Sequence, residues 1–170
     1  MKAIIFDLDQ TLVDSQRIEY LRRSRQWSKV YRSIPEIKVY GGIDNILSIL
    51  RDIKIKLSIA SAGPSSYIQR LVRHFGWSFD AIVCYPDTVQ HKPNPEPLIK
   101  AANRLNIDVV DCWAVGDDPI DIIAARRADM YSVGALWGSL NKDALRKANP
   151  DMMFETTESF YEKICEISKL

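Results

Sequence analysis

The stretch that decides the fold is KAIIFDLDQTLVDS, residues 2–15, in which a short apolar run stops at two carboxylates. Residues 3–6, AIIF, are continuously apolar, which is typical of a strand buried on both faces of a parallel sheet. Asp7 and Asp9 are separated by a single residue, Leu8, so an extended backbone would direct both to the same side. Because adjacent like charges repel, we expect either a counter-ion between them or a proton on one. Both conditions are commoner at active sites than in structural cores.

Further short apolar runs alternate with segments of helical spacing along the rest of the chain. The runs lie at residues 56–60, 81–85, 112–115 and 131–136, with a weaker one at 152–154. Between them, apolar residues at helical spacing predict helices that include residues 43–53, 67–75 and 98–105. This alternation predicts an α/β fold, a three-layer Rossmann-like parallel sheet flanked by helices. With 170 residues and no linker or repeat, we expect one domain spanning residues 1–170.

The composition excludes several classes of protein. A formal net charge of +1 gives no overall nucleic-acid signature, and no apolar run reaches the roughly 18 residues needed to span a membrane. The start, MKAIIF, meets charge too early for a signal peptide, so the expected location is the cytoplasm, without membrane attachment. Three widely spaced cysteines favour buried thiols over a disulfide framework or a zinc site.

Polar residues gather where each predicted strand ends, and ligands of such sheets bind at that edge. Four segments contribute, and their candidate residues are Asp7 and Asp9, then Ser61, then Lys92, and finally Asp117, Asp118 and Asp121. Acidic, hydroxyl and ammonium groups would therefore meet at one edge of the sheet. This convergence is a stronger signal than any single motif.

These segments resemble the motifs of the haloacid dehalogenase-like (HAD) superfamily. The matching stretches, in order, are DLDQT (7–11), IASAG (59–63), HKPNPEP (91–97) and GDDPID (116–121), and the resemblance runs from residue 3 to about residue 160. It implies a Mg²⁺-dependent hydrolase. Relatives that remove halide from carbon need no acid at the position of Asp9, whereas phosphohydrolases carry this aspartate, so the resemblance favours a phosphatase.

The chemistry of the residues agrees with the roles that the resemblance implies. The Asp7 carboxylate can attack phosphorus to give an aspartyl phosphate, and Asp9 can serve as the general acid and then the general base. Because carboxylate and phosphate repel, a hard divalent cation is needed between them. In the family it is held by the Asp7 carboxylate, the Asp9 carbonyl and the Asp117 carboxylate. Phosphoryl oxygens are expected to bind Lys92, Ser61 and the loop backbone at Ala62.

Two acidic residues of the last motif have open assignments. Asp121 either binds the metal through water or braces the Lys92 ammonium. Asp118 stands where the family often carries Ser or Thr, and it is about as well suited to capping a helix as to supporting the site.

The segment 15–36 is expected to be a short, cap-like helical insert where relatives usually carry a complete helical cap. Placed on one helix over residues 15–34, its aromatic and aliphatic residues share one face: Tyr20, Trp27, Val30, Tyr31 and Ile34. Its basic residues share the other: Arg17, Arg22, Arg25, Lys29 and Arg32. The plain interpretation is an amphipathic helix with a solvated face. The alternative is that the basic face attracts a polyanion, including a nucleic-acid end.

Two classes of function therefore remain at this point. The favoured one is a phosphomonoester hydrolase with an open site, suited to a bulky or varied phosphorylated small molecule or to a phosphorylated polymer end. The other is a non-catalytic or regulatory module that binds a polyanion or a protein partner through residues 15–34.

Overall fold

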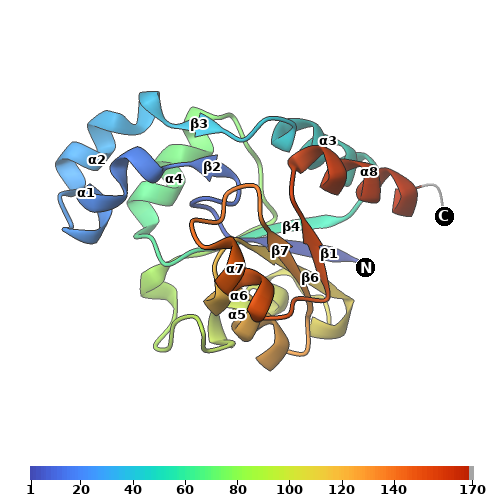
Figure 1. Cartoon of the computed structure of the whole chain (residues 1–170). Coiled ribbons are helices and arrows are strands. Elements are labelled where there is room, and N and C mark those ends of the chain that lie inside the picture. Colours follow the sequence, from blue (N-terminus) through green and yellow to red (C-terminus); the bar gives the residue numbers. More distant parts are fainter. Residues whose placement is uncertain (169–170) are drawn as a thin grey trace.

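The computed structural model of the chain describes residues 1–168 and is built around a six-stranded parallel sheet (Figure 1). The strand order β5-β4-β1-β6-β7-β8 places β1 (Ala3–Phe6) in the interior of the sheet. The other strands are β4 (Lys56–Ala60), β5 (Ala81–Val83), β6 (Cys112–Gly116), β7 (Tyr131–Ala135) and β8 (Met152–Phe154). The predicted α/β fold is confirmed. The run 81–85 ends two residues early because a 3-10 turn begins at Tyr85.

Alternating residues of β1 explain how the two faces of the sheet are covered. Ile4 and Phe6 belong to a core shared with helices on one face, whereas Ala3 and Ile5 belong to a second core on the other. The first face carries α3 (Ile43–Asp52), α4 (Ser65–His74) and α8 (Thr157–Ser168). The second carries α5 (Glu96–Leu105) and α6 (Pro119–Arg127), and α7 (Lys142–Lys147) packs against α6. Within residues 1–168, no helix combines the length and apolarity that crossing a bilayer requires.

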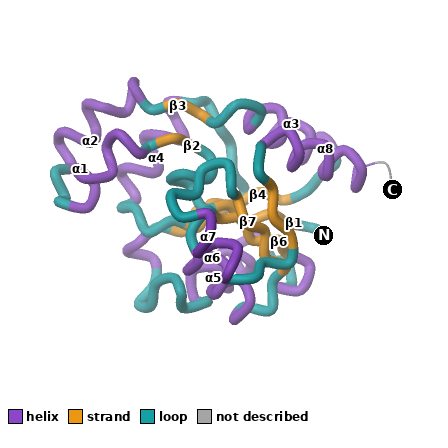
Figure 2. The backbone as a smooth tube through the Cα atoms, viewed as in Figure 1, coloured by secondary structure: helices purple, strands orange, loops and turns teal. Residues whose placement is uncertain are grey.

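The insert is held at its base by two short antiparallel strands, β2 (Val13–Asp14) and β3 (Lys38–Val39), which the sequence did not predict. Between them lie a 3-10 turn (Gln16–Ile18), α1 (Glu19–Arg23), α2 (Trp27–Ser33) and a second 3-10 turn (Ile34–Glu36). A loop separates α1 from α2 (Figure 2). The prediction of one helix over residues 15–34 is therefore wrong.

The break between α1 and α2 has a local cause. The Ser24 hydroxyl donates to the carbonyl of Tyr20 at 2.7 Å, which offers the chain an alternative to continuing the helix. Arg25 follows in the left-handed region, with φ of 55°. The Gln26 N–H then donates back to the Leu21 carbonyl at 2.9 Å, which closes the turn.

The break also changes which side chains face the core. Val30 and Ile34 are buried, and Trp27 and Tyr31 pack against the core, as predicted. Tyr20, however, is 65% exposed. Arg22 was assigned to the solvated face, but its side chain is only 19% exposed and turns inward. A periodicity of 100° per residue fails here because α1 and α2 do not share one helix axis.

Candidate active site

The segment after β1 turns tightly at the carboxyl edge of the sheet. The Asp7 N–H donates to the Val115 carbonyl at 2.8 Å, which extends the pairing of β1 with β6 by one residue. The Leu12 N–H then donates to the Leu8 carbonyl at 2.9 Å, and Gln10 within this turn has φ of 64°. These backbone contacts set where the side chains of Asp7 and Asp9 begin.

Asp7 lies against a buried ammonium group. The Lys92 Nζ atom is 2.9 Å from Asp7 Oδ1 and 2.8 Å from Asp121 Oδ1, and the lysine side chain is only 7% exposed. Burial raises the pKa of Asp7 to about 7, although the nearby Lys92 charge acts in the opposite direction. Burial alone would lower the pKa of Lys92, but the charges of Asp121 and Asp7 outweigh it and raise that pKa. One lysine thus connects two carboxylates.

Asp121 and Asp118 have distinct structural roles. Asp121 braces Lys92 through Oδ1, and its Oδ2 accepts the Asp118 N–H at 3.1 Å. Asp118 caps α6, since its Oδ1 accepts the Ile120 N–H at 3.0 Å. Gly116 permits this arrangement, because a Cβ there would lie 2.4 Å from the Asp121 side chain. These contacts are those of a brace for Lys92 and of a helix cap.

Three carboxylates meet beside this lysine. Asp7, Asp117 and Asp121 each present an oxygen within 4.8 Å of the others. Asp117 accepts a hydrogen bond from the Thr11 hydroxyl at 2.9 Å, and burial followed by the charge of Asp7 raises its pKa to about 9. A single ammonium cannot balance three carboxylates. A cluster of carboxylate oxygens is the donor set that hard divalent cations prefer, so these residues fit such a cation.

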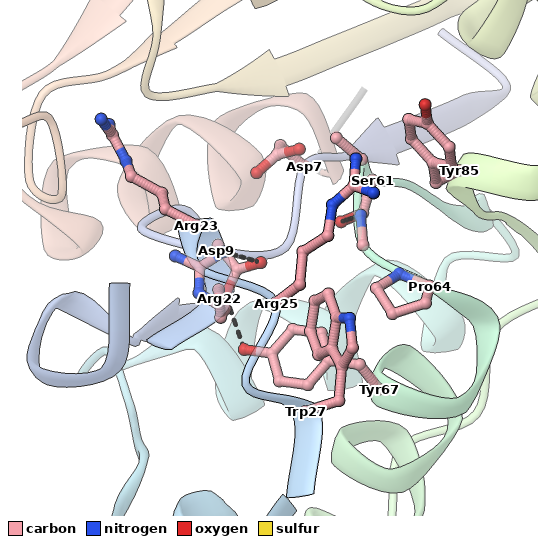
Figure 3. A pocket seen from close by; sticks show the side chains of 12 residues that line it. Asp7, Asp9, Arg22, Arg23, Arg25, Trp27, Ser61, Pro64, Tyr67 and Tyr85 are labelled. Carbon is pink, nitrogen blue, oxygen red and sulfur yellow. Dashed lines mark hydrogen bonds and ion pairs between the residues drawn. The ribbon is translucent and has the colours of Figure 1, made fainter. Parts of the chain in front are cut away.

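Asp9 is held by a different set of groups. Its Oδ1 accepts hydrogen bonds from the Ser15 hydroxyl at 2.6 Å and the Tyr67 hydroxyl at 2.7 Å. Its Oδ2 lies 2.7 Å from Arg22 Nη1 in α1. Figure 3 shows Arg22 and Tyr67 converging on Asp9, with Asp7 apart from this cluster. Each aspartate thus has its own side-chain cation, Arg22 for Asp9 and Lys92 for Asp7. The raised pKa of Asp7 agrees with the expectation that one of the pair can hold a proton.

Ser61 begins the loop between β4 and α4. Its N–H donates to the Val83 carbonyl at 3.0 Å, and its Oγ accepts the Gly63 N–H at 3.2 Å. The hydroxyl proton therefore remains available to a bound anion. Ser61 and Ala62 line a cavity of about 520 Å³ that is also bordered by Asp7 and Asp9. The amino-terminal end of α4 reaches this cavity through Gly63 and Pro64, and a helix amino terminus favours negative charge.

The insert and the loop after β5 supply the remaining walls of this cavity. Trp27 and Tyr85 stand on its border with Arg25 (Figure 3), and sequence reasoning assigned a site role to neither aromatic residue. A second cavity, of about 370 Å³, is bordered by Lys92, Asp117 and Asn141 and shares Asp7 and Asp9 with the first. The structure thus brings all four predicted segments together. It adds Arg22, Ser15 and Tyr67, which no local motif marks.

Residues 19–135 match the family model described as haloacid dehalogenase-like hydrolase. The chain belongs to this family. The matched region of this HAD-like chain begins after Asp7 and Asp9 and includes Ser61, Lys92 and Asp117. The resemblance inferred from the motifs is therefore confirmed at the level of the family.

Two curated relatives show how far this similarity extends. The chain is 31% identical over 135 residues to a Caldanaerobacter subterraneus subsp. tengcongensis protein named "Putative pyrophosphatase PpaX", which covers 75% of the chain and 61% of the relative. It is 32% identical over 130 residues to a phosphoglycolate phosphatase of Xanthomonas campestris pv. campestris. That alignment covers 75% of this chain and 59% of the relative. This HAD-like chain thus spans about three fifths of the length of these relatives.

Solved structures show the same fold. A hydrolase from Pseudomonas syringae superimposes with a TM-score of 0.83 at 21% identity, covering 98% of this chain and 99% of that one. A structure described as a predicted phosphoglycolate phosphatase from Haemophilus somnus gives a TM-score of 0.82 at 18% identity, covering 96% and 97%. The Rossmann-like architecture of this HAD-like chain is therefore shared across distant sequences.

Proposed function

We propose that this HAD-like hydrolase is a Mg²⁺-dependent phosphomonoesterase that acts through an aspartyl phosphate on Asp7. The observation that carries the proposal is the pairing of Asp7 with the buried Lys92 ammonium at 2.9 Å, at the border of two cavities. A carboxylate beside a fixed cation can approach a phosphate that it would otherwise repel. The phosphatase names of the curated relatives support this choice.

The proposed reaction has two displacements. The Asp7 carboxylate attacks phosphorus, the bond from phosphorus to the leaving oxygen breaks, and Asp9 gives its proton to that oxygen. Asp9 then takes a proton from water, which attacks the phosphorus of the aspartyl phosphate. This releases inorganic phosphate and restores both carboxyl groups to their starting states. Lys92 holds a positive charge beside the transferring phosphoryl group throughout.

Three groups of this chain would hold the metal ion, namely the carboxylates of Asp7 and Asp117 and the backbone carbonyl of Asp9. When bound, Mg²⁺ would supply positive charge between the carboxylates and the phosphate. Asp121 would brace Lys92 through Oδ1, while its Oδ2 accepts the Asp118 N–H. The Ser61 hydroxyl and the Ala62 N–H would donate to phosphoryl oxygens.

The leaving group of the substrate would occupy the cavity of about 520 Å³ between the insert and the β4–α4 loop. The Arg25 side chain makes no hydrogen bond or ion pair within residues 1–168, and Figure 3 shows it extending toward Ser61. Arg22 and Arg23 are engaged by Asp9 and Glu19, so fewer basic groups of the insert are free than the sequence suggested. This favours a phosphorylated small molecule over a polymer end.

The test is release of inorganic phosphate from a panel of sugar phosphates, carboxylate-bearing phosphates, nucleotides and phosphorylated oligonucleotides, with Mg²⁺ or with EDTA. We expect turnover of at least one small phosphomonoester that EDTA abolishes and added Mg²⁺ restores. Asp7→Asn should lose the activity, because an amide is a poor nucleophile. The control is Arg32→Gln, an exposed change on the insert. Activity that survives in Asp7→Asn would contradict a mechanism through an aspartyl phosphate on Asp7. Turnover of oligonucleotides alone would show that the substrate is a phosphorylated polymer end and not a small molecule.

A further inference from the structure

Two neighbouring arginines of α1 behave differently. The Arg23 side chain is 79% exposed and pairs with Glu19 at 2.6 Å, as an ordinary surface ion pair on a helix. Arg22 leaves the surface instead. Its Nη1 atom lies 2.7 Å from Asp9 Oδ2, and its guanidinium carbon lies 6.0 Å from the centre of the Tyr67 ring. Arg22 therefore reaches the one carboxylate that is proposed to transfer protons.

Counting the acceptor positions of Asp9 shows what this contact does. A carboxylate offers about four lone-pair positions, two on each oxygen. Ser15 and Tyr67 occupy both positions on Oδ1, and Arg22 occupies one on Oδ2. One position on Oδ2 remains. The three donors thus fix the plane of the carboxylate and leave one oxygen available to a leaving group or a water molecule.

The ion pair between Arg22 and Asp9 would be unfavourable in free energy if its only role were to attach α1 to the core. Arg22 is largely buried, and its Nε atom has no hydrogen-bond partner among the described residues. Burying a guanidinium with one donor unpaired is unfavourable, whereas an apolar side chain could attach α1 to the core without that loss. A requirement at Asp9 accounts for an arginine at this position.

We propose that Arg22 is a positioning residue, supplied by the insert, that orients Asp9 Oδ2 for proton transfer. The inference rests on the proposed phosphatase function and adds to it a residue outside the four sheet-edge segments. Arg22 acts through Asp9 and not on the phosphoryl group. Its importance should therefore follow the need for acid assistance, which is large for an alkyl phosphate and small for an activated aryl phosphate.

The experiment compares Arg22→Met, Arg22→Lys and the surface control Arg32→Gln on an alkyl phosphate and on p-nitrophenyl phosphate. For Arg22→Met we expect kcat on the alkyl phosphate to fall about 10- to 100-fold, part of the 10²–10⁴-fold typical of general acid-base catalysis. The first turnover of the aryl phosphate should change by less than about threefold. Arg22→Lys keeps one charged donor and should recover part of the loss. Thermal melting of each variant shows whether folding is intact.

A second arm places Arg22→Met in an Asp9→Asn background. If Arg22 works through Asp9, the double variant should be no slower than Asp9→Asn alone, within about twofold. Equal losses on the two substrates, additive losses in the double variant, or faster turnover by Arg22→Met would each overturn the positioning role while leaving the Asp7-dependent phosphatase in place. A wild-type protein inactive on every phosphate of the panel would overturn the proposed function and the role of Arg22 with it.

Discussion

Asp7 and Asp9 are two residues apart and border the same cavities, yet their partners come from different parts of the molecule. Asp7 is paired with Lys92, which α6 braces through Asp121, so its surroundings belong to the sheet and its helices. Asp9 is held largely by Ser15 and Arg22 of the insert. In the proposed mechanism, the nucleophile Asp7 is therefore supported by the core, and the proton-transfer group Asp9 is supported largely by the insert.

The largest expected effect tests the proposed separation of roles between Asp7 and Asp9, by removing the proton-transfer function of Asp9 alone. Asp9→Asn keeps the size of the side chain but cannot exchange a proton, so kcat for an alkyl phosphate should fall by about 10²–10⁴-fold. With an activated aryl phosphate, we expect a burst of leaving group followed by slow turnover, because hydrolysis of the phosphoenzyme still needs a base. Rapid mixing with quantified burst amplitude measures this.

The matched control for that experiment is Asp143→Asn, a surface carboxylate whose side chain is 87% exposed. It should leave both the burst and the steady state unchanged. A normal steady-state rate for Asp9→Asn on the alkyl phosphate would contradict the separation of roles between the two carboxylates.

A second test separates the charge beside Asp7 from the metal ligand. Lys92→Ala should lower kcat by about 10²–10³-fold, as expected for loss of a fixed charge at the phosphoryl group, with a small change in the Mg²⁺ requirement. Asp117→Ala should instead raise the Mg²⁺ concentration needed for half-maximal activity by more than about tenfold, since even outer-shell changes cost that much. Mg²⁺ titrations of both variants decide between these outcomes, and an unchanged requirement in Asp117→Ala would count against ligation.

The acidic cluster also predicts how stability depends on pH. Burial raises the pKa of Asp117 to about 9 in the folded chain, well above its ordinary value. The folded state therefore binds a proton that the unfolded state releases, so this contribution to stability is fully present below pH 4 and is lost as pH rises toward 9. Without metal, the melting temperature should fall by a few degrees between pH 5 and 8.

Adding Mg²⁺ should raise the melting temperature more at pH 8 than at pH 5, because the ion competes with protons for the same carboxylates. Thermal melts in EDTA and in Mg²⁺ at both values measure the difference. Asp117→Asn should reduce the pH dependence. Equal stabilisation by Mg²⁺ at the two pH values would indicate that the ion binds outside this cluster.

The smallest expected effect concerns Arg25, whose side chain is exposed and unpaired within the described residues. Arg25→Gln should raise KM about threefold for a substrate with a second anionic group, since exposed ion pairs contribute less than about 1 kcal/mol. The difference should shrink as salt rises, because screening acts over about 10 Å at 0.1 M. Lys29→Gln, an exposed change on α2, is the control. Identical KM values for Arg25→Gln and Lys29→Gln would show that the second anionic group of the substrate does not bind near Arg25.

The same division explains what could be predicted from the sequence. The strands and the gathering of Asp7, Ser61, Lys92 and Asp117 at one edge follow from apolar runs and from the geometry of parallel sheets, which depend on local pattern. The inward turn of Arg22 depends on a side-chain hydrogen bond that ends α1 at Ser24 and on the left-handed backbone of the next residue. A helix end of this kind and a single left-handed residue produce no periodic pattern of apolar residues in the sequence.

The pairing of β2 with β3 gives the insert a property beyond its contacts. Val13 lies opposite Val39 and Asp14 opposite Lys38, so residues 15–37 begin and end at one closed pair of strands. The entropic cost of closing such a loop grows only slowly with its length. The β2–β3 pair holds the two ends of the loop together, so a longer or shorter segment would change this cost little. We therefore expect that segments of other lengths could be grafted between Asp14 and Lys38 with Asp7 kept in place, provided that they replace the apolar contacts of Val30 and Ile34.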